Sequence, residues 1–96
     1  MSPLNKKKLA IIRNKLDKLD NSLIKIIKQR TILVKKVLKL KDKKKQIVDK
    51  TRIKKILSNI KKKSILNNID PKITKRIWYN MIRTYIDFEK RNFKKK

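Results

Sequence analysis

The sequence predicts an all-α protein with three helices per chain, one of them very long, assembled as an intertwined dimeric helical bundle. The chain contains no Gly and two Pro, which disfavours strands and tight hairpins. Apolar residues make up 39% of the chain and charged residues 41%, and their helical periodicity is typical of amphipathic helices. The length of 96 residues predicts a single domain over residues 1–96.

The first helix is predicted over residues 4–42. Ser2 and Pro3 offer an N-cap and a first-turn proline. Apolar residues then recur every three or four positions, at Leu9, Ile12, Leu16, Leu19, Leu23 and Ile26, and, after a gap at position 30, at Leu33, Val37 and Leu40. Such a helix would be ~57 Å long, which is too long for a compact monomer of this size. We therefore expect two chains to intertwine.

Two shorter helices are predicted after a charged connector at residues 43–45, which repels itself and is expected to move. Asp49 can cap a helix over residues 49–66, with asparagines at 67 and 68 ending it. Asp70 and Pro71 begin a third helix over residues 70–93. Residues 94–96 form a basic tail. The predicted buried positions are Ile53, Ile56, Leu57, Ile60, Ile73, Ile77, Trp78, Met81, Ile82, Tyr85 and Phe88.

The composition excludes several classes of chemistry. The chain has no Cys and no His, which rules out disulfides and thiol catalysis and makes most metal sites improbable. No apolar run approaches the ~18 residues of a membrane span, and the N-terminus lacks a hydrophobic signal core. We therefore expect a cytoplasmic enzyme or binding protein that uses no metal or cofactor.

The net charge of +25 first suggests a nucleic-acid partner. Lysine supplies 26 of the 32 cationic residues, and these lysines occupy the outward positions of all three predicted helices. This distribution favours a solvated surface over an organised groove. Non-specific adhesion to nucleic acid is still expected at low salt.

Two charged residues lie on the apolar stripes. Arg30 occupies the position in the first stripe where the next hydrophobe is expected. Glu89, the only glutamate, continues the stripe formed by Trp78, Ile82 and Tyr85. A guanidinium on a core-facing stripe is costly unless an anion meets it. The chain must supply a carboxylate there or bind one from outside.

The spacing of the other cations points to a site shared between chains. Arg13 and Lys41 share a face of the first helix but would be ~42 Å apart on one chain. In two antiparallel copies, Arg13 of one chain can meet Arg30 and Lys41 of the other, with Arg52 folded back toward Lys41. The site formed by the two chains would be apolar, with several cations and one carboxylic acid. The planar fork of arginine suits it to carboxylates.

Each of these residues also has a purely structural reading. Arg13 can be a solvated surface residue, and Arg52 can pair with Asp49 in its own first turn. Arg30 can pair with a core Asp or with Glu89.

The ordered motifs resemble the all-helical chorismate mutase family. Residues 9–13 (L-A-I-I-R), 16–20 (L-D-K-L-D) and 29–30 (Q-R) are similar to the family's opening helix, and Lys41 falls at its helix-one lysine. Residues 48–53 (V-D-K-T-R-I) resemble the start of helix two, and residues 77–89, ending in Glu89, resemble helix three. The resemblance covers residues 4 to 93.

This resemblance implies an intertwined homodimer with two equivalent sites for a small dicarboxylate. Arg30 and Arg13 of the partner subunit would hold the substrate carboxylates. The region of Asp49 and Arg52 would close the ring side of the substrate.

The implied reaction is the Claisen rearrangement of chorismate to prephenate in aromatic amino-acid biosynthesis. Lys41 would contact a carboxylate and the ether oxygen, and Glu89 would face that oxygen from the opposite side. The step forms no covalent enzyme intermediate, so catalysis comes from conformer selection and charge stabilisation. Glu89 donates a hydrogen bond only when protonated, so activity is expected to fall as pH rises through that ionisation.

Two residues depart from the usual mutase pattern. Ile53 stands where mutases usually place Glu, and Tyr85 stands where a small side chain is common. Both favour the related isochorismate-pyruvate lyases, which form salicylate, as an alternative to the mutase. A basic nucleic-acid-binding helical protein is an alternative from another class, although the five aromatics sit at core spacing in the third helix. An inactive family member with a regulatory role is a further alternative, disfavoured by retention of the four cations and Glu89.

Overall fold

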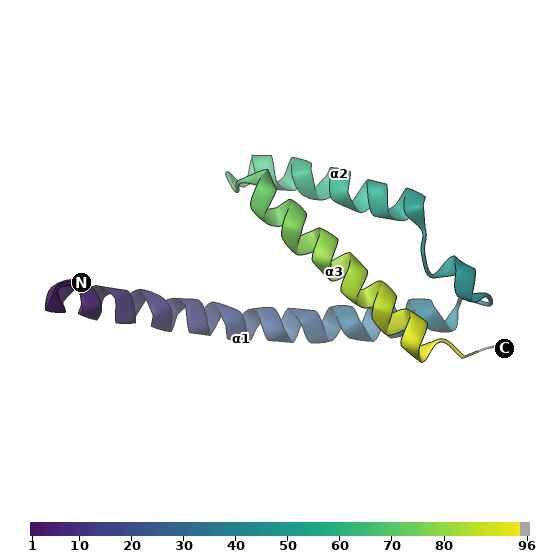
Figure 1. Cartoon of the computed structure of the whole chain (residues 1–96), viewed down its shortest axis with the longest axis horizontal. Helices are drawn as coiled ribbons and strands as arrows, with labels where there is room; N and C mark the ends of the chain where they lie inside the picture. Colours follow the sequence, from purple (N-terminus) through teal and green to yellow (C-terminus); the bar gives the residue numbers. More distant parts are fainter. Residues whose placement is uncertain (95–96) are drawn as a thin grey trace. The chain divides into compact units, whose positions relative to one another are not determined.

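The described residues, 1–94 of this computed structural model, form helices and no strands. The three long helices are α1 (Pro3–Lys39), α2 (Lys50–Leu66) and α3 (Pro71–Asn92), and a short 3₁₀ turn, η1 (Lys44–Gln46), lies between α1 and α2 (Figure 1). The predicted all-α class is confirmed, whereas the intertwined dimer stays a prediction. Of the predicted basic tail, Lys95 and Lys96 lie outside the described residues. The chain divides into two compact units, residues 1–33 and the residues from 34 onward.

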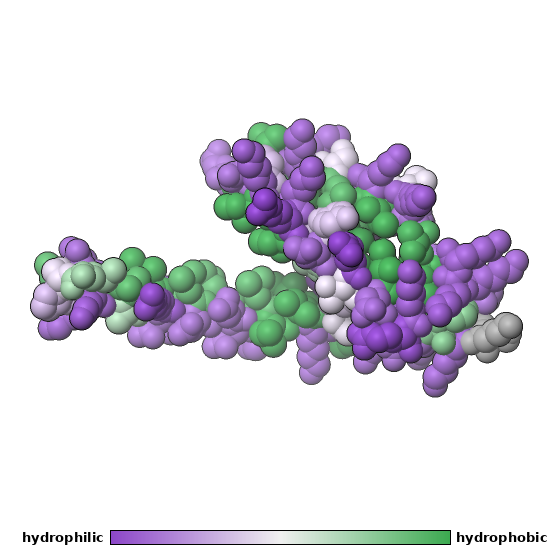
Figure 2. All heavy atoms as spheres, viewed as in Figure 1, coloured by the Kyte–Doolittle hydropathy of each residue, from purple (hydrophilic) through white to green (hydrophobic). Residues whose placement is uncertain are grey.

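The first unit is the amphipathic N-terminal part of α1. Ser2 caps this helix, because its Oγ accepts a hydrogen bond from the backbone N–H of Asn5 at 3.2 Å. The apolar stripe is open to solvent: Leu16 and Leu23 are each 53% exposed, and Leu19 is 61% exposed. Figure 2 shows hydrophobic side chains gathered along one side of the N-terminal part of α1 and hydrophilic side chains along the other. The unit therefore presents an uncovered hydrophobic face.

The second unit begins with the last turns of α1, which end earlier than predicted. The helix stops at Lys39, not at Asp42. The amides of Leu40 and Lys41 donate to the carbonyls of Val37 and Leu38, three residues back, at 3.0 and 3.1 Å. This tightening of the last turn is a common way to finish a helix.

The connector after α1 is a defined turn. Within the predicted charged connector, Lys44–Gln46 forms η1, and its predicted mobility stays a prediction. Ile47, directly after this turn, is 4% exposed and is the one buried hydrophobic residue among residues 1–94. Burial of Ile47 anchors the connector despite the repulsion between its lysines.

The helices α2 and α3 pack against each other as a hairpin (Figure 1). Each begins at the predicted aspartate: the Asp49 carboxylate accepts from the Arg52 backbone N–H at 3.0 Å, and that of Asp70 accepts from the Lys72 N–H at 2.9 Å. Asn67 ends α2, and Asn68 follows with a left-handed φ of 56°, a conformation that asparagine tolerates well.

The contact between α2 and α3 includes a buried pair of hydroxyls. Ser64 Oγ and Thr74 Oγ1 lie 2.6 Å apart, and the two residues are 3% and 8% exposed. Ser64 also donates to the Ile60 carbonyl at 2.6 Å. The pair ties the end of α2 to the first turns of α3.

The hairpin positions that were predicted to be buried are half-buried, with two exceptions. Ile53, Ile56, Leu57 and Ile60 of α2 and Trp78, Met81, Ile82, Tyr85 and Phe88 of α3 are all half-buried. Ile73 and Ile77 are 55% and 50% exposed, so the prediction of burial is wrong for these two. Among the described residues, no helix is long and apolar enough to cross a membrane.

Candidate active site

Burial separates one cation and one carboxylate from the charged background. Lys41 is the only lysine among residues 1–94 that is not exposed, and every arginine is exposed. All six aspartates are exposed as well, whereas Glu89 is 7% exposed. Charged groups are rarely buried without a partner. The two exceptions are therefore expected to meet, and they do.

Lys41 and Glu89 form a direct ion pair between the end of α1 and the last turns of α3. The Lys41 ammonium donates to Glu89 Oε2 at 2.9 Å, and the two side chains are 19% and 10% exposed. By contrast, the Arg91–Asp87 pair of α3, also at 2.9 Å, has side chains that are 64% and 68% exposed. The Lys41–Glu89 pair is thus shielded from solvent, where electrostatic interactions are stronger.

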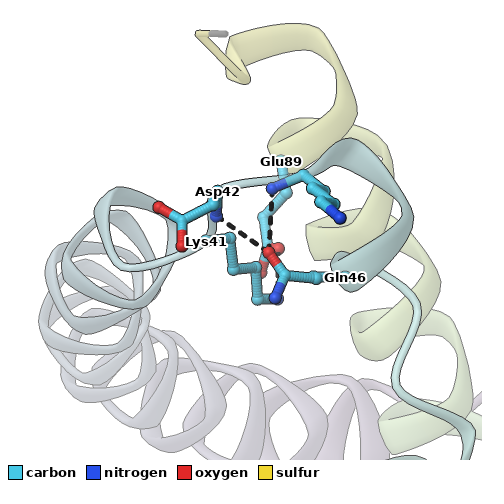
Figure 3. A network of polar contacts seen from close by, with 5 residues as sticks. Lys41, Asp42, Gln46 and Glu89 are labelled. Atoms are coloured by element: carbon cyan, nitrogen blue, oxygen red, sulfur yellow. Dashed lines mark hydrogen bonds and ion pairs between the residues drawn. The ribbon is translucent and has the colours of Figure 1, made fainter. Parts of the chain in front are cut away.

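The backbone beside Lys41 is held by a glutamine side chain. Gln46 Oε1 accepts hydrogen bonds from the backbone N–H groups of Asp42 and Lys43, at 2.8 Å each. Figure 3 shows this contact together with Lys41 and Glu89, where the connector follows α1. Gln46 was missed in the sequence because Lys43, three residues earlier, is not a capping residue type.

The predicted residues of the second unit are only partly brought together. Tyr85 is half-buried and lies one turn before Glu89 on α3, so the two share a helix face. Asp49 and Arg52 are exposed at the start of α2. The Asp49 carboxylate accepts the Arg52 backbone N–H at 3.0 Å, and a pairing of the two side chains stays a prediction.

The two remaining predicted residues lie in the first unit. Arg13 and Arg30 both project from α1 and are exposed. Glu89, one of the alternative partners predicted for Arg30, is paired with Lys41. Arg30 thus remains a cation on an uncovered apolar face, where its predicted role as an anion clamp is untested.

The surface hollow between α2 and α3 is a separate feature. It encloses about 380 Å³ and is lined by Leu57, Ser58, Lys61, Pro71, Lys72 and Lys75. None of the predicted site residues is among them, and the three lysines are exposed. Across the described part of the chain, no cluster of three or more His, Cys, Asp or Glu side chains could hold a metal ion. The shielded Lys41–Glu89 pair is therefore the better candidate for chemistry.

Comparison with known proteins agrees with the sequence motifs. The family model described as chorismate mutase type II matches residues 12–90, a span that includes Arg13, Lys41 and Glu89. Neither the curated proteins nor the solved structures give a match.

Proposed function

The chain belongs to the chorismate mutase type II family, and we propose that it catalyses the Claisen rearrangement of chorismate to prephenate. The observation that carries this proposal is the shielded Lys41–Glu89 pair, with its 2.9 Å contact. The rearrangement breaks the ether C–O bond as a new C–C bond forms, and negative charge develops on the ether oxygen. A cation held at that oxygen stabilises the transition state more than the ground state.

Lys41 is the proposed donor to the ether oxygen. Its ammonium has three N–H groups, so it can keep the hydrogen bond to Glu89 and still direct another at the substrate. Glu89 can donate from the other side of the oxygen only when it carries a proton. The pair would therefore flank the breaking bond, with its geometry set before substrate arrives.

The proposed carboxylate clamp consists of Arg30 and Arg13 of the partner subunit. Both arginines are exposed on the apolar face of α1, which a second chain is expected to cover. In an antiparallel pair of α1 helices, Arg13 of one chain approaches Arg30 and Lys41 of the other. Asp49 and Arg52 are the proposed contacts to the ring side of the substrate.

A second candidate function rests on two residues. Ile53 and Tyr85 occupy positions where an acidic and a small side chain are usual in the mutases that this chain resembles. Without an acid at position 53, the substrate hydroxyl loses one expected hydrogen-bond partner. Isochorismate-pyruvate lyase activity, which forms salicylate and pyruvate in a similar cationic pocket, is the alternative.

One assay separates these functions. The purified chain is incubated with chorismate and, separately, with isochorismate, and prephenate and salicylate are quantified by chromatography. Formation of prephenate from chorismate supports the mutase. Formation of salicylate from isochorismate, without prephenate from chorismate, supports the lyase. The absence of both products would overturn the enzyme proposal. If the inactive chain bound RNA tightly and in a salt-sensitive way, the result would favour a nucleic-acid-binding protein.

A matched pair of variants tests the proposed role of Lys41. Lys41→Met retains most of the side-chain length but removes the ammonium, and we expect kcat to fall by at least about a hundredfold. Lys62→Met removes one charge from an exposed position on α2 and should leave kcat within about twofold. Equal loss in both variants would show that the effect comes from net charge.

A further inference from the structure

In the segment that follows Lys41, one side-chain oxygen accepts hydrogen bonds from two backbone amides. Lys41 lies beyond the last residue of α1, so the helical ladder does not fix the backbone after it. The next two backbone N–H groups, of Asp42 and Lys43, both donate to Gln46 Oε1 at 2.8 Å. An amide oxygen has two lone pairs, and here both are used on consecutive amides.

Gln46 is itself held in place by its surroundings. Its backbone N–H donates to the Lys43 carbonyl at 3.0 Å, and the Ile47 N–H donates to the Lys44 carbonyl at 3.1 Å. Ile47 is 4% exposed, so the residue next to Gln46 is fixed by burial. The oxygen that accepts from the two amides is therefore presented from an anchored turn.

We propose that Gln46 is a positioning residue that aims Lys41 at its partner Glu89. This inference rests on the proposed function, in which Lys41 contacts the reacting ether oxygen. Lysines 43, 44 and 45 repel one another, and without the Gln46 oxygen their repulsion favours an open connector. An open connector moves the Lys41 backbone and lengthens the reach of its ammonium to Glu89 Oε2, now 2.9 Å away.

Three variants of the connector test this role. Gln46→Met keeps the length of the side chain but removes the acceptor. Gln46→Glu restores an oxygen that accepts from both amides. Lys45→Met changes an exposed residue of the same turn and leaves the acceptor in place. Gln46 is exposed, so water can satisfy the two amides in Gln46→Met and the chain should still fold.

Steady-state kinetics give the first readout. We expect Gln46→Met to lower kcat by about tenfold to a hundredfold, the range for a catalytic group displaced by a fraction of an ångström to one ångström. KM should change by less than about threefold, since the carboxylate clamp is untouched. Gln46→Glu should recover kcat to within about threefold of the parent, and Lys45→Met should match the parent. An unchanged kcat in Gln46→Met would overturn the positioning role.

Nuclear magnetic resonance gives a readout that needs no substrate. Amide hydrogen exchange at Asp42 and Lys43 should accelerate in Gln46→Met and not in Lys45→Met, and the Glu89 carboxyl 13C signal should shift toward its position in Lys41→Met. If the parent turns over neither chorismate nor isochorismate, the proposed function fails, while these signals still decide whether Gln46 orders Lys41. Unchanged exchange and an unchanged Glu89 signal would overturn the inference even if the enzyme is active.

Discussion

At the scale of single residues, burial identifies the candidate catalytic pair more clearly than charge does. Lysines and arginines cover this chain, so a cation by itself indicates little. A lysine that is 19% exposed at its side chain, bonded to a carboxylate that is 10% exposed, is different, because removing either group from water is costly. Such sites are enriched for function, although ion pairs that only stabilise a fold share the same geometry.

Replacement of Glu89 separates these two roles. Glu89→Gln supplies a permanent N–H donor, whereas the native carboxyl donates only when protonated. The amide oxygen of the variant can still accept from Lys41, so we expect Glu89→Gln to keep kcat within about tenfold of the native chain, whereas Glu89→Ala, which removes both donor and acceptor, should lower kcat by at least about a hundredfold. The measurement is kcat with chorismate at one fixed pH.

The control for these variants is Asp87→Asn. It removes the carboxylate of the exposed pair with Arg91 two residues away, and its kcat should match that of the native chain. A kcat in Glu89→Ala equal to the native value would remove Glu89 from the proposed role.

Arg30 is predicted to act through the geometry of its guanidinium as well as its charge. Arg30→Lys keeps the cation but loses the two parallel hydrogen bonds to a carboxylate. We expect kcat/KM to fall about tenfold to a hundredfold, as for one lost charge-assisted hydrogen bond. Arg76→Lys makes the same substitution at an exposed position of α3 and should be neutral. Equal kcat/KM in Arg30→Lys and the native chain would exclude a bidentate clamp.

At the scale of elements, residues with local roles were predictable and residues with distant partners were not. Ser2, Asp49 and Asp70 cap their helices as predicted, because a cap bonds to amides two or three residues away. The end of α1 was predicted three residues late: the apolar pattern continues to Leu40, whereas the last turn already tightens through backbone bonds from Leu40 and Lys41. The contact of Lys41 with Glu89 joins residues 48 positions apart. The family resemblance placed both residues at one site, on opposite sides of the ether oxygen, but it did not predict their direct contact.

The hydroxyl pair in the hairpin was also absent from the prediction, and it provides a test of packing between α2 and α3. Thr74→Val keeps the shape of the side chain but removes the hydrogen bond to Ser64. We expect a loss of about 1 kcal/mol in the free energy of unfolding, measured by urea denaturation. Thr84→Val removes an exposed hydroxyl that bonds only locally, to the Asn80 carbonyl, and should cost less.

A double-mutant cycle assigns this loss to the pair. Ser64→Ala, Thr74→Val and the double variant should show a coupling of about 0.5 to 1 kcal/mol, as expected for directly bonded residues. Strictly additive losses would mean that the two hydroxyls stabilise the hairpin independently.

At the scale of the whole molecule, the uncovered stripe of α1 is the main unexplained feature of a single chain. Leu16, Leu19 and Leu23 are each more than half exposed, and a contiguous apolar face of this kind usually marks an interface. Arg30 on the same face then has a physical purpose, because a guanidinium at an interface is favourable when an anion is bound there. Assembly and substrate binding would be two consequences of one helix face.

Mixed dimers test whether the site is shared between chains. The Arg13→Ala and Arg30→Ala variants should each be nearly inactive alone. In a heterodimer of the two, one site regains both arginines and the other loses both. Equal amounts of the two variants are unfolded together and refolded, so that about half of the dimers are mixed. Each mixed dimer has one intact site of two, and the mixture should therefore show about a quarter of native activity.

The control mixture combines Arg30→Ala with Lys41→Ala. Both residues are predicted to serve the site of their own chain, so neither site of that heterodimer is complete and activity should stay at the level of the separate variants. Recovery of activity in the control mixture as well would show that Arg30 and Lys41 of one site come from different chains. Rescue in neither would place Arg13 in the same chain's site or outside it, and the long exposed face of α1 would then serve assembly alone.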